Sequence, residues 1–159
     1  MPSPLPAPPR GLKAVFWRLP IWIYRLHLGF LLGERFVLLE HIGRKSGLRR
    51  YAVLEVIGKD AHPLTYCVAS GFGERSQWFR NVLAHPEVAV QVGRRRYRAR
   101  ARRLPYEEAV ARLQAYARAH PRALQELARL LHYPYDGSEA SLRAMAEIVP
   151  VVCFRITGE

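Results

Sequence analysis

Apolar and polar residues recur with two different periods along this chain, and each period predicts one kind of element. Short apolar runs with a two-residue period, separated by turns rich in glycine or charge, are typical of strands. Strands are therefore expected at 36–42, 49–57, 64–70, 88–92, 96–103 and 151–156, with a turn at 58–60.

Helical spacing replaces this alternation between the last two of these strands. Pro105, followed by Glu107 and Glu108, predicts the start of a helix, because acidic residues suit a helix N-terminus. Arg118 and His120 suit its end. Further helices are expected at 77–84, at 121–132, from 138 onward and, rich in aromatic residues, at 13–32.

Strands joined mostly by tight turns, then helices, then a returning strand predict an α+β fold rather than a doubly wound sheet. A split β-barrel of about six mostly antiparallel strands would also hide its strand edges. We expect this barrel to carry one N-terminal helix and several C-terminal helices. A flexible leader at 1–10 and a single domain at 11–159 complete the predicted organisation.

The formal net charge of +12 restricts the partners, because a basic protein suits nucleic acid, an anionic membrane or an acidic cofactor. Five arginines alternate along the fifth strand: Arg94, Arg96, Arg98, Arg100 and Arg102. Such a stripe suits a solvated face or a nucleic-acid groove. The solvated face is favoured, because no aromatic residue lies on the arginine face to stack on bases.

The two cysteines, Cys67 and Cys153, lie inside apolar runs without CxxC spacing, which predicts reduced, buried thiols in a cytoplasmic protein. The six histidines have no metal-binding spacing, so no metal is expected. The uncharged stretches near the N-terminus are too short to span a bilayer. The helix at 13–32 is expected to cap the core, with a membrane surface as the alternative.

Two loops carry the chemistry that the sequence indicates. Gly43 to Arg50 sets cations and a hydroxyl between glycines at a strand turn, which suits a phosphate or carboxylate. Ser70 to Arg75 leads into a helix start with Trp78 and Asn81, which suit an anion and a flat ring. Together the loops predict a cofactor that carries both a phosphate and a ring.

The order of these pieces resembles the deazaflavin-dependent nitroreductases, a family of the split β-barrel flavin and deazaflavin oxidoreductases. The matching pieces are Gly43-Arg44-Lys45-Ser46-Gly47 with Arg50, then Val68-Ala69-Ser70-Gly71, then Trp78-Phe79-Arg80-Asn81. The resemblance implies binding of the 5-deazaflavin coenzyme F420, whose phosphodiester and oligoglutamate tail are anionic.

The resemblance also implies which residues contact the coenzyme. They are Arg44, Lys45, Ser46, Arg50, Val53, Leu54, Val68, Ala69, Ser70, Gly71, Gln77, Trp78, Phe79, Arg80 and Asn81. Ser70 is expected to face substrate as well. The tyrosines that line the substrate side in the family are replaced here by His120, Ala123 and Glu126, so Tyr133, Tyr116 or Tyr135 is expected to supply a hydroxyl instead.

The function implied is transfer of a hydride from reduced F420 to an electron-poor acceptor: a quinone, an activated alkene or a nitroaromatic. No catalytic residue is identified, since a proton can come from solvent or a tyrosine. FMN in the same barrel is the first alternative, and a basic protein that binds nucleic acid is the second. A homodimer, a cytoplasmic location and membrane contact through the N-terminal helix are further expectations.

Overall fold

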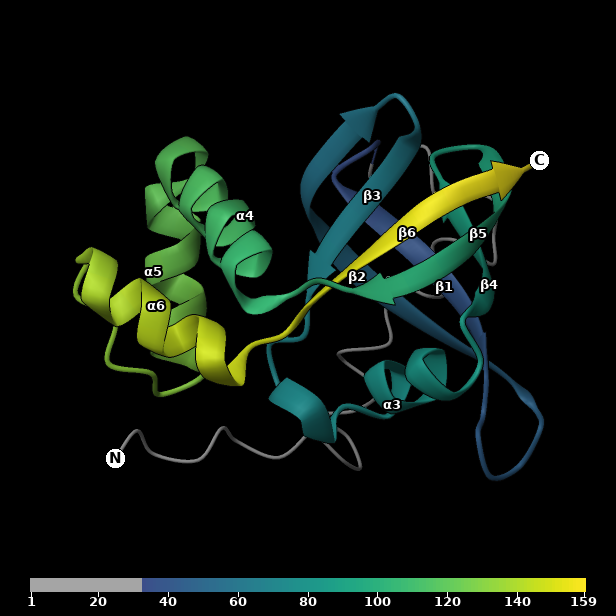
Figure 1. Cartoon of the computed structure of the whole chain (residues 1–159), viewed down its shortest axis with the longest axis horizontal. Coiled ribbons are helices and arrows are strands. Elements are labelled where there is room, and N and C mark those ends of the chain that lie inside the picture. The colour runs from purple at the N-terminus through teal and green to yellow at the C-terminus, as the bar shows by residue number, and fades with distance from the viewer. Residues whose placement is uncertain (1–32) are drawn as a thin grey trace.

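The computed structural model describes residues 33–159, so the predicted leader and the predicted helix at 13–32 lie outside the described residues. Six strands form a closed antiparallel barrel in the order β1-β2-β3-β6-β5-β4 (Figure 1). They are β1 (Phe36–Ile42), β2 (Arg49–Ala61), β3 (Leu64–Ala69), β4 (Glu87–Val92), β5 (Arg95–Arg103) and β6 (Val151–Gly158). The predicted α+β barrel is therefore confirmed.

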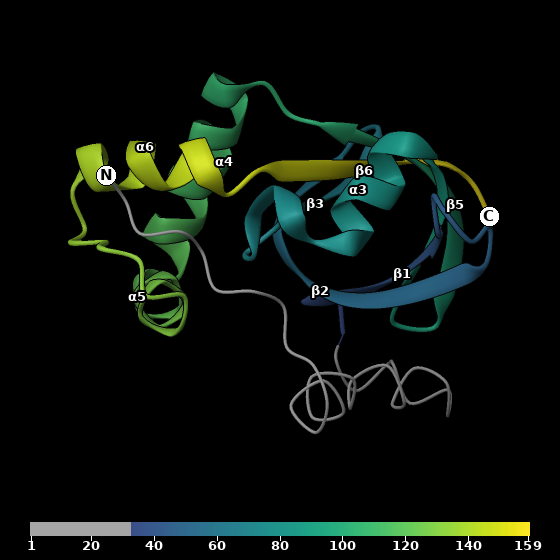
Figure 2. The same cartoon turned by 90° about the horizontal axis from the view of Figure 1, so that it is seen from below.

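The helices fall into two groups. One group lies under the barrel: the 3-10 turn η2 (Gly73–Arg75) and α3 (Gln77–Ala84). The other group lies beside the barrel and comprises α4 (Tyr106–Ala119), α5 (Pro121–Leu130) and α6 (Glu139–Ile148) (Figures 1 and 2). The second group fills the chain between β5 and β6, as its helical spacing predicted.

The predicted turn at 58–60 is wrong. β2 runs through Gly58 to Ala61, and the reversal falls at His62–Pro63, whose peptide bond is cis. Residues 58–61 pair with β3, and a register shift between Val56 and Gly58 marks a bulge there. Glycine and charged residues suit either a turn or a bulged strand, and only the partner strand distinguishes the two.

Two hydrophobic cores share the strands β3 and β6. Inside the barrel, Val152 and Phe154 of β6 pack with residues of the other strands and with Phe79 of α3. On the outer side, Val151 and Cys153 pack against α4, α5 and α6. Because both faces of β6 are covered, its apolar residues form a continuous run instead of an alternation.

The prediction of reduced thiols is wrong, because Cys67 of β3 and Cys153 of β6 form a disulfide. The two residues are direct partners in the β3–β6 ladder. Their sequence separation of 86 residues hid this pairing, since nothing in the spacing reveals which strands become neighbours.

The arginine stripe of β5 is a solvated face, as predicted. Its arginines are exposed, while the intervening Tyr97, Ala99 and Ala101 are buried. Carboxylates pair with several of these guanidinium groups: Glu40 with Arg96, Glu87 with Arg100 and Glu108 with Arg102. These carboxylates lower the net positive charge of the face, and each pair is exposed to solvent, so it holds its partners only weakly.

Because Cys67 and Cys153 are bonded, protein purified without reductant should contain no free thiol. Alkylation of the denatured protein, followed by intact mass, is expected to add nothing before reduction and a label on both cysteines afterwards. Reduction should lower the free energy of unfolding by about 2–5 kcal/mol in urea titrations. In the control, Cys153→Ala, reductant should have no effect. Alkylation of both thiols without reduction would contradict the disulfide.

Candidate functional site

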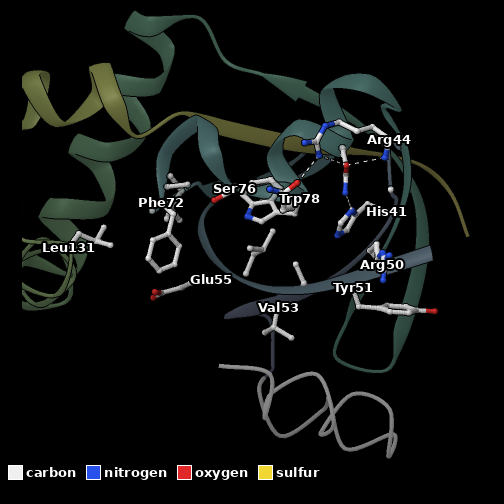
Figure 3. A pocket seen from close by; sticks show the side chains of 18 of the residues that line it. His41, Arg44, Arg50, Tyr51, Val53, Glu55, Phe72, Ser76, Trp78 and Leu131 are labelled. Atoms are coloured by element: carbon white, nitrogen blue, oxygen red, sulfur yellow. Dashed lines mark hydrogen bonds between the residues drawn. The ribbon is translucent and has the colours of Figure 1, made fainter. Parts of the chain in front are cut away.

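A cleft of about 720 Å³ lies between the barrel and the helices α4 and α5 (Figure 3). The β1–β2 loop, β2, the segment after β3 and the first turn of α3 form most of its wall, and single residues of α4 and α5 complete it. It is large enough to cover most of a ligand of cofactor size.

The two loops singled out in the sequence converge on this cleft. Lys45 of the first loop and Trp78 of the second both line it. The predicted residues that line the cleft are Arg44, Lys45, Ser46, Arg50, Val53, Leu54, Ala69, Gly71, Gln77, Trp78 and Asn81. They come together because β1, β2 and β3 are neighbours in the barrel and α3 follows β3 directly.

The β1–β2 loop is closed by its own backbone. The amide of Gly43 donates to the carbonyl of Leu48, and the amide of Gly47 donates to the carbonyl of Gly43, both at 2.8 Å. Gly47 has a φ of +70°, a conformation that glycine adopts without strain. A Cβ at Gly43 would lie only 2.5 Å from Oγ of Ser46, so a larger residue there would make the Ser46 hydroxyl rotate away.

A partly buried polar network centred on Asn81 holds this loop against α3. The side chain of Asn81 accepts hydrogen bonds from the backbone amide of Arg44 at 3.1 Å and from its Nη1 at 2.9 Å. The same Nη1 donates to Oε1 of Gln77 at 2.9 Å. Arg44 and Gln77 therefore act first on the protein itself, and they fix the shape of the cleft at this end.

His41 extends the network and was not selected from the sequence. Nδ2 of Asn81 lies 3.1 Å from Nδ1 of His41. Because Oδ1 of Asn81 already accepts from Arg44, its amide nitrogen donates to Nδ1, and the histidine proton sits on Nε2. Burial, with the positive charge of Arg50 as a second cause, lowers the pKa of His41 to about 4. His41 is thus a neutral acceptor at physiological pH.

The end of the cleft near this network is positively charged. Lys45 and Arg50 line it, and within residues 33–159 neither forms an ion pair with a carboxylate. The first turn of α3 opens onto the same region through Ser76 and Gln77. Backbone amides at a helix N-terminus attract anions, and the lysine and arginine strengthen that attraction.

The other end of the cleft is mostly apolar and contains one polar pair. Figure 3 shows Phe72, Leu131 and Glu55 at the end away from His41 and Arg44. The hydroxyl of Tyr116 in α4 donates to Oε1 of Glu55 at 2.8 Å. Burial and this carboxylate raise the pKa of Tyr116, so its hydroxyl keeps its proton to strongly alkaline pH.

Five of the predicted residues do not line the cleft. Val68 and Phe79 are buried in the barrel core. Tyr133 is buried among the helices. Arg80 is exposed and donates to the carbonyl of Glu74. The hydroxyl of Ser70 is buried and donates to the carbonyl of Gly73 at 2.7 Å. Sequence neighbours of the first, second, fourth and fifth of these residues line the cleft instead, because side chains alternate in direction along strands and turn by about 100° per residue in helices, whereas no neighbour of Tyr133 does.

The lining residues that the sequence did not reveal come from elements whose neighbours were unknown. His41 had a signal, since it continues the buried face of Val37 and Leu39 in β1 directly before the basic loop. Glu55 had none as a site residue, because its partner Tyr116 lies 61 residues away on a helix stripe that resembles ordinary core. Phe72, Leu127 and Leu131 likewise depend on how α5 packs.

Among residues 33–159, no group of three or more His, Cys, Asp or Glu side chains is placed to hold a metal ion. In the same part of the chain, no helix has the length and apolar character needed to cross a bilayer.

His41 makes the free energy of unfolding depend on pH. The unfolded chain binds this proton near pH 6.5, whereas the folded protein resists it until about pH 4, so stability falls as pH decreases through that interval. His41→Gln keeps an acceptor for Asn81 and removes the titration. Urea titrations from pH 7 to pH 4 should show a smaller loss in the variant, by about 3 kcal/mol. An identical loss in both proteins would contradict a neutral, buried His41.

The chain is similar over most of its length to one family of reductases. A family model described as F420H(2)-dependent quinone reductase matches residues 18–128. A protein of Mycobacterium tuberculosis (strain ATCC 25618 / H37Rv), named as an F420H(2)-dependent quinone reductase, Rv3178, is 34% identical over 104 residues. The match covers 65% of this chain and 82% of that relative.

Solved structures share the fold. A structure described as an F420-H2 dependent reductase (FDR-A) has a TM-score of 0.54 and 24% identity, covering 77% of this chain and 96% of that one. A chain described as a domain-swapped dimer has a TM-score of 0.56 and 22% identity, covering 89% of this chain and 99% of that one. These structural similarities support the split-barrel fold. The match to the family model shows the family. The chain belongs to the F420H(2)-dependent quinone reductases, a family of split-barrel oxidoreductases.

Proposed function

We propose that the cleft binds coenzyme F420 and that the enzyme transfers a hydride from its reduced form to a quinone. The observation that carries this proposal is the convergence of two predicted loops on one cleft that is cationic at one end and apolar at the other. An elongated ligand with an anionic tail and a flat ring fits that division. The residues present therefore suit the coenzyme that the family uses.

Lys45 and Arg50 are proposed to hold the anionic parts of the coenzyme, with the hydroxyl of Ser46 between them in the loop. Their charges are available, since neither is paired with a carboxylate within residues 33–159. Arg44 is proposed to act differently. Its guanidinium is bonded to Gln77 and Asn81, so it positions the loop and adds a fixed positive charge behind the ligand.

Trp78, Val53 and Leu54 are proposed to form the wall along the ring. When bound, reduced F420 supplies the hydride, and the protein supplies orientation and a site poor in water. Phe72, Leu127 and Leu131 exclude water at the apolar end and leave room for the acceptor. The hydroxyl of Tyr116 retains its proton there and lies at the apolar end, so Tyr116 is proposed for the role assigned to Tyr133 from the sequence.

A quinone is the favoured acceptor because it combines a flat apolar ring with oxygens that accept hydrogen bonds. Activated alkenes and nitroaromatics share the electron-poor character and stay predictions. FMN in place of F420 is the enzymatic alternative. The alternative of a nucleic-acid-binding protein loses its main support, because carboxylates pair with arginines of the β5 face.

A single domain over 11–159, a homodimer, a cytoplasmic location and membrane contact stay predictions. The chain described as a domain-swapped dimer shows that a similar fold assembles in pairs. Membrane contact rests on residues 13–32, whose tryptophans and arginines suit a lipid surface.

The function is tested by fluorescence titration with oxidised F420 and FMN in parallel, followed by turnover of F420H2 with menadione. Tight binding of F420, weaker binding of FMN and oxidation of F420H2 that requires menadione are expected. Preferential binding of FMN, or no turnover with F420H2, would overturn the proposal.

Lys45→Ala should weaken F420 binding about tenfold, because a charge-assisted contact to an anionic tail is lost. FMN, with a single phosphate and no tail, should lose less affinity. Both dissociation constants are measured by fluorescence titration. Lys59→Ala is the matched control, since Lys59 pairs with Glu34 and does not line the cleft. Equal losses for F420 and FMN would contradict the proposed role of Lys45.

A further inference from the structure

Charge is distributed unevenly along the cleft. Lys45 and Arg50 line one end, whereas Glu55 is the one acidic side chain among the described residues that line the cleft. Glu55 lies at the apolar end, beside Phe72 in Figure 3. Its side chain is 35% exposed, so water solvates part of this carboxylate in an otherwise apolar wall, and its contacts with the protein must stabilise the rest.

The contacts of Glu55 hold the carboxylate without neutralising it. The hydroxyl of Tyr116 donates to Oε1 at 2.8 Å, and Nε of Arg35 approaches the same oxygen at 3.6 Å. No residue of 33–159 donates a hydrogen bond to Oε2. The side chain of Arg35 is 68% exposed, so solvent screens its charge and such a pair contributes little.

We infer that Glu55 is a specificity-determining residue that admits uncharged acceptors to the apolar end of the cleft and rejects anionic ones. This inference rests on the proposed function, because it concerns the acceptor of the same site. The cationic end is occupied by the tail of the coenzyme, so an acceptor must enter beside Glu55. An anionic acceptor in contact with Glu55 would be repelled by the carboxylate, whose side chain is 35% exposed, so solvent weakens the repulsion without removing it.

Oε2 of Glu55, to which no residue of 33–159 donates, gives the carboxylate an attractive role toward the reduced product rather than toward the acceptor. It can accept a hydrogen bond from a hydroxyl group, which a quinone acquires when it is reduced. Tyr116 serves as a positioning residue, because its hydrogen bond fixes the direction in which Oε2 points. The apolar lining of this end suits a neutral naphthoquinone or benzoquinone, and Glu55 disfavours one that carries a sulfonate or carboxylate.

The test compares two probes of similar shape, menadione and 1,4-naphthoquinone-2-sulfonate. Their dissociation constants are measured by calorimetry on full-length protein saturated with oxidised F420, a condition without turnover. The wild-type protein should bind menadione roughly tenfold or more tightly than the sulfonate, because two like charges in contact at a protein surface cost at least this much. Glu55→Gln should bring the two constants within about threefold of each other, mainly by tightening the sulfonate.

Two controls separate charge from other effects. Tyr116→Phe keeps the carboxylate, so the preference for menadione should persist. Glu139→Gln removes an equal charge from the exposed surface of α6, away from the cleft, and should leave both constants unchanged. A ratio that is the same in Glu55→Gln as in wild type, or a wild-type protein without preference, would overturn the inference.

The outcome also distinguishes this inference from the proposed function. Protein that does not bind oxidised F420 contradicts the proposed function, and the two probes are then compared on coenzyme-free protein. On that protein, the inference is supported if Glu55→Gln binds the sulfonate more tightly relative to menadione than wild type does. An unchanged ratio of the two dissociation constants overturns it. If the enzyme turns over menadione but Glu55→Gln leaves the ratio of the two dissociation constants unchanged, the proposed function stands and the role of Glu55 in specificity is rejected.

Discussion

In this barrel β6 runs between β3 and β5, and the position of this last strand determines where the helical side of the site lies. Its two faces complete two cores at once, with Phe154 directed into the barrel and Cys153 toward the helices. Because β6 must return to β3, the helices α4, α5 and α6 are held beside the barrel, where Tyr116 and Leu131 reach the cleft (Figure 2). The disulfide between Cys67 and Cys153 secures the same strand pair.

A second constraint acts at the opposite end of the cleft, where polar groups rather than apolar packing fix the geometry. Asn81 is buried, and each half of its amide has a partner: Arg44 for the oxygen, His41 for the nitrogen. A buried network that is fully satisfied stabilises one arrangement, since any other leaves a polar group without a hydrogen bond. The loop after β1 is therefore shaped before any ligand arrives, which lowers the cost of ordering it on binding.

The high positive charge of the chain takes on a more specific meaning in the folded protein. On the outer face of β5, Arg96 and Arg102 lie beside carboxylates, which lowers the net positive charge of that face. In the cleft, Lys45 and Arg50 form no such pairs within the described residues, while Glu55 stands at the far end. The two ends of the cleft therefore differ in charge, so an anionic ligand is favoured at the end with Lys45 and Arg50 and disfavoured at the end with Glu55.

The sequence by itself determined the elements and the basic loop, because alternation, helix ends and glycine positions are local properties of the chain. It predicted the helix 77–84 to the residue and indicated Lys45 and Trp78 as parts of one site. It missed the bulge at Gly58, the disulfide and the pairing of Glu55 with Tyr116. Each of these depends on which strands and helices become neighbours, and only the tertiary structure decides that, since contacts between distant segments leave no periodic signal in the sequence.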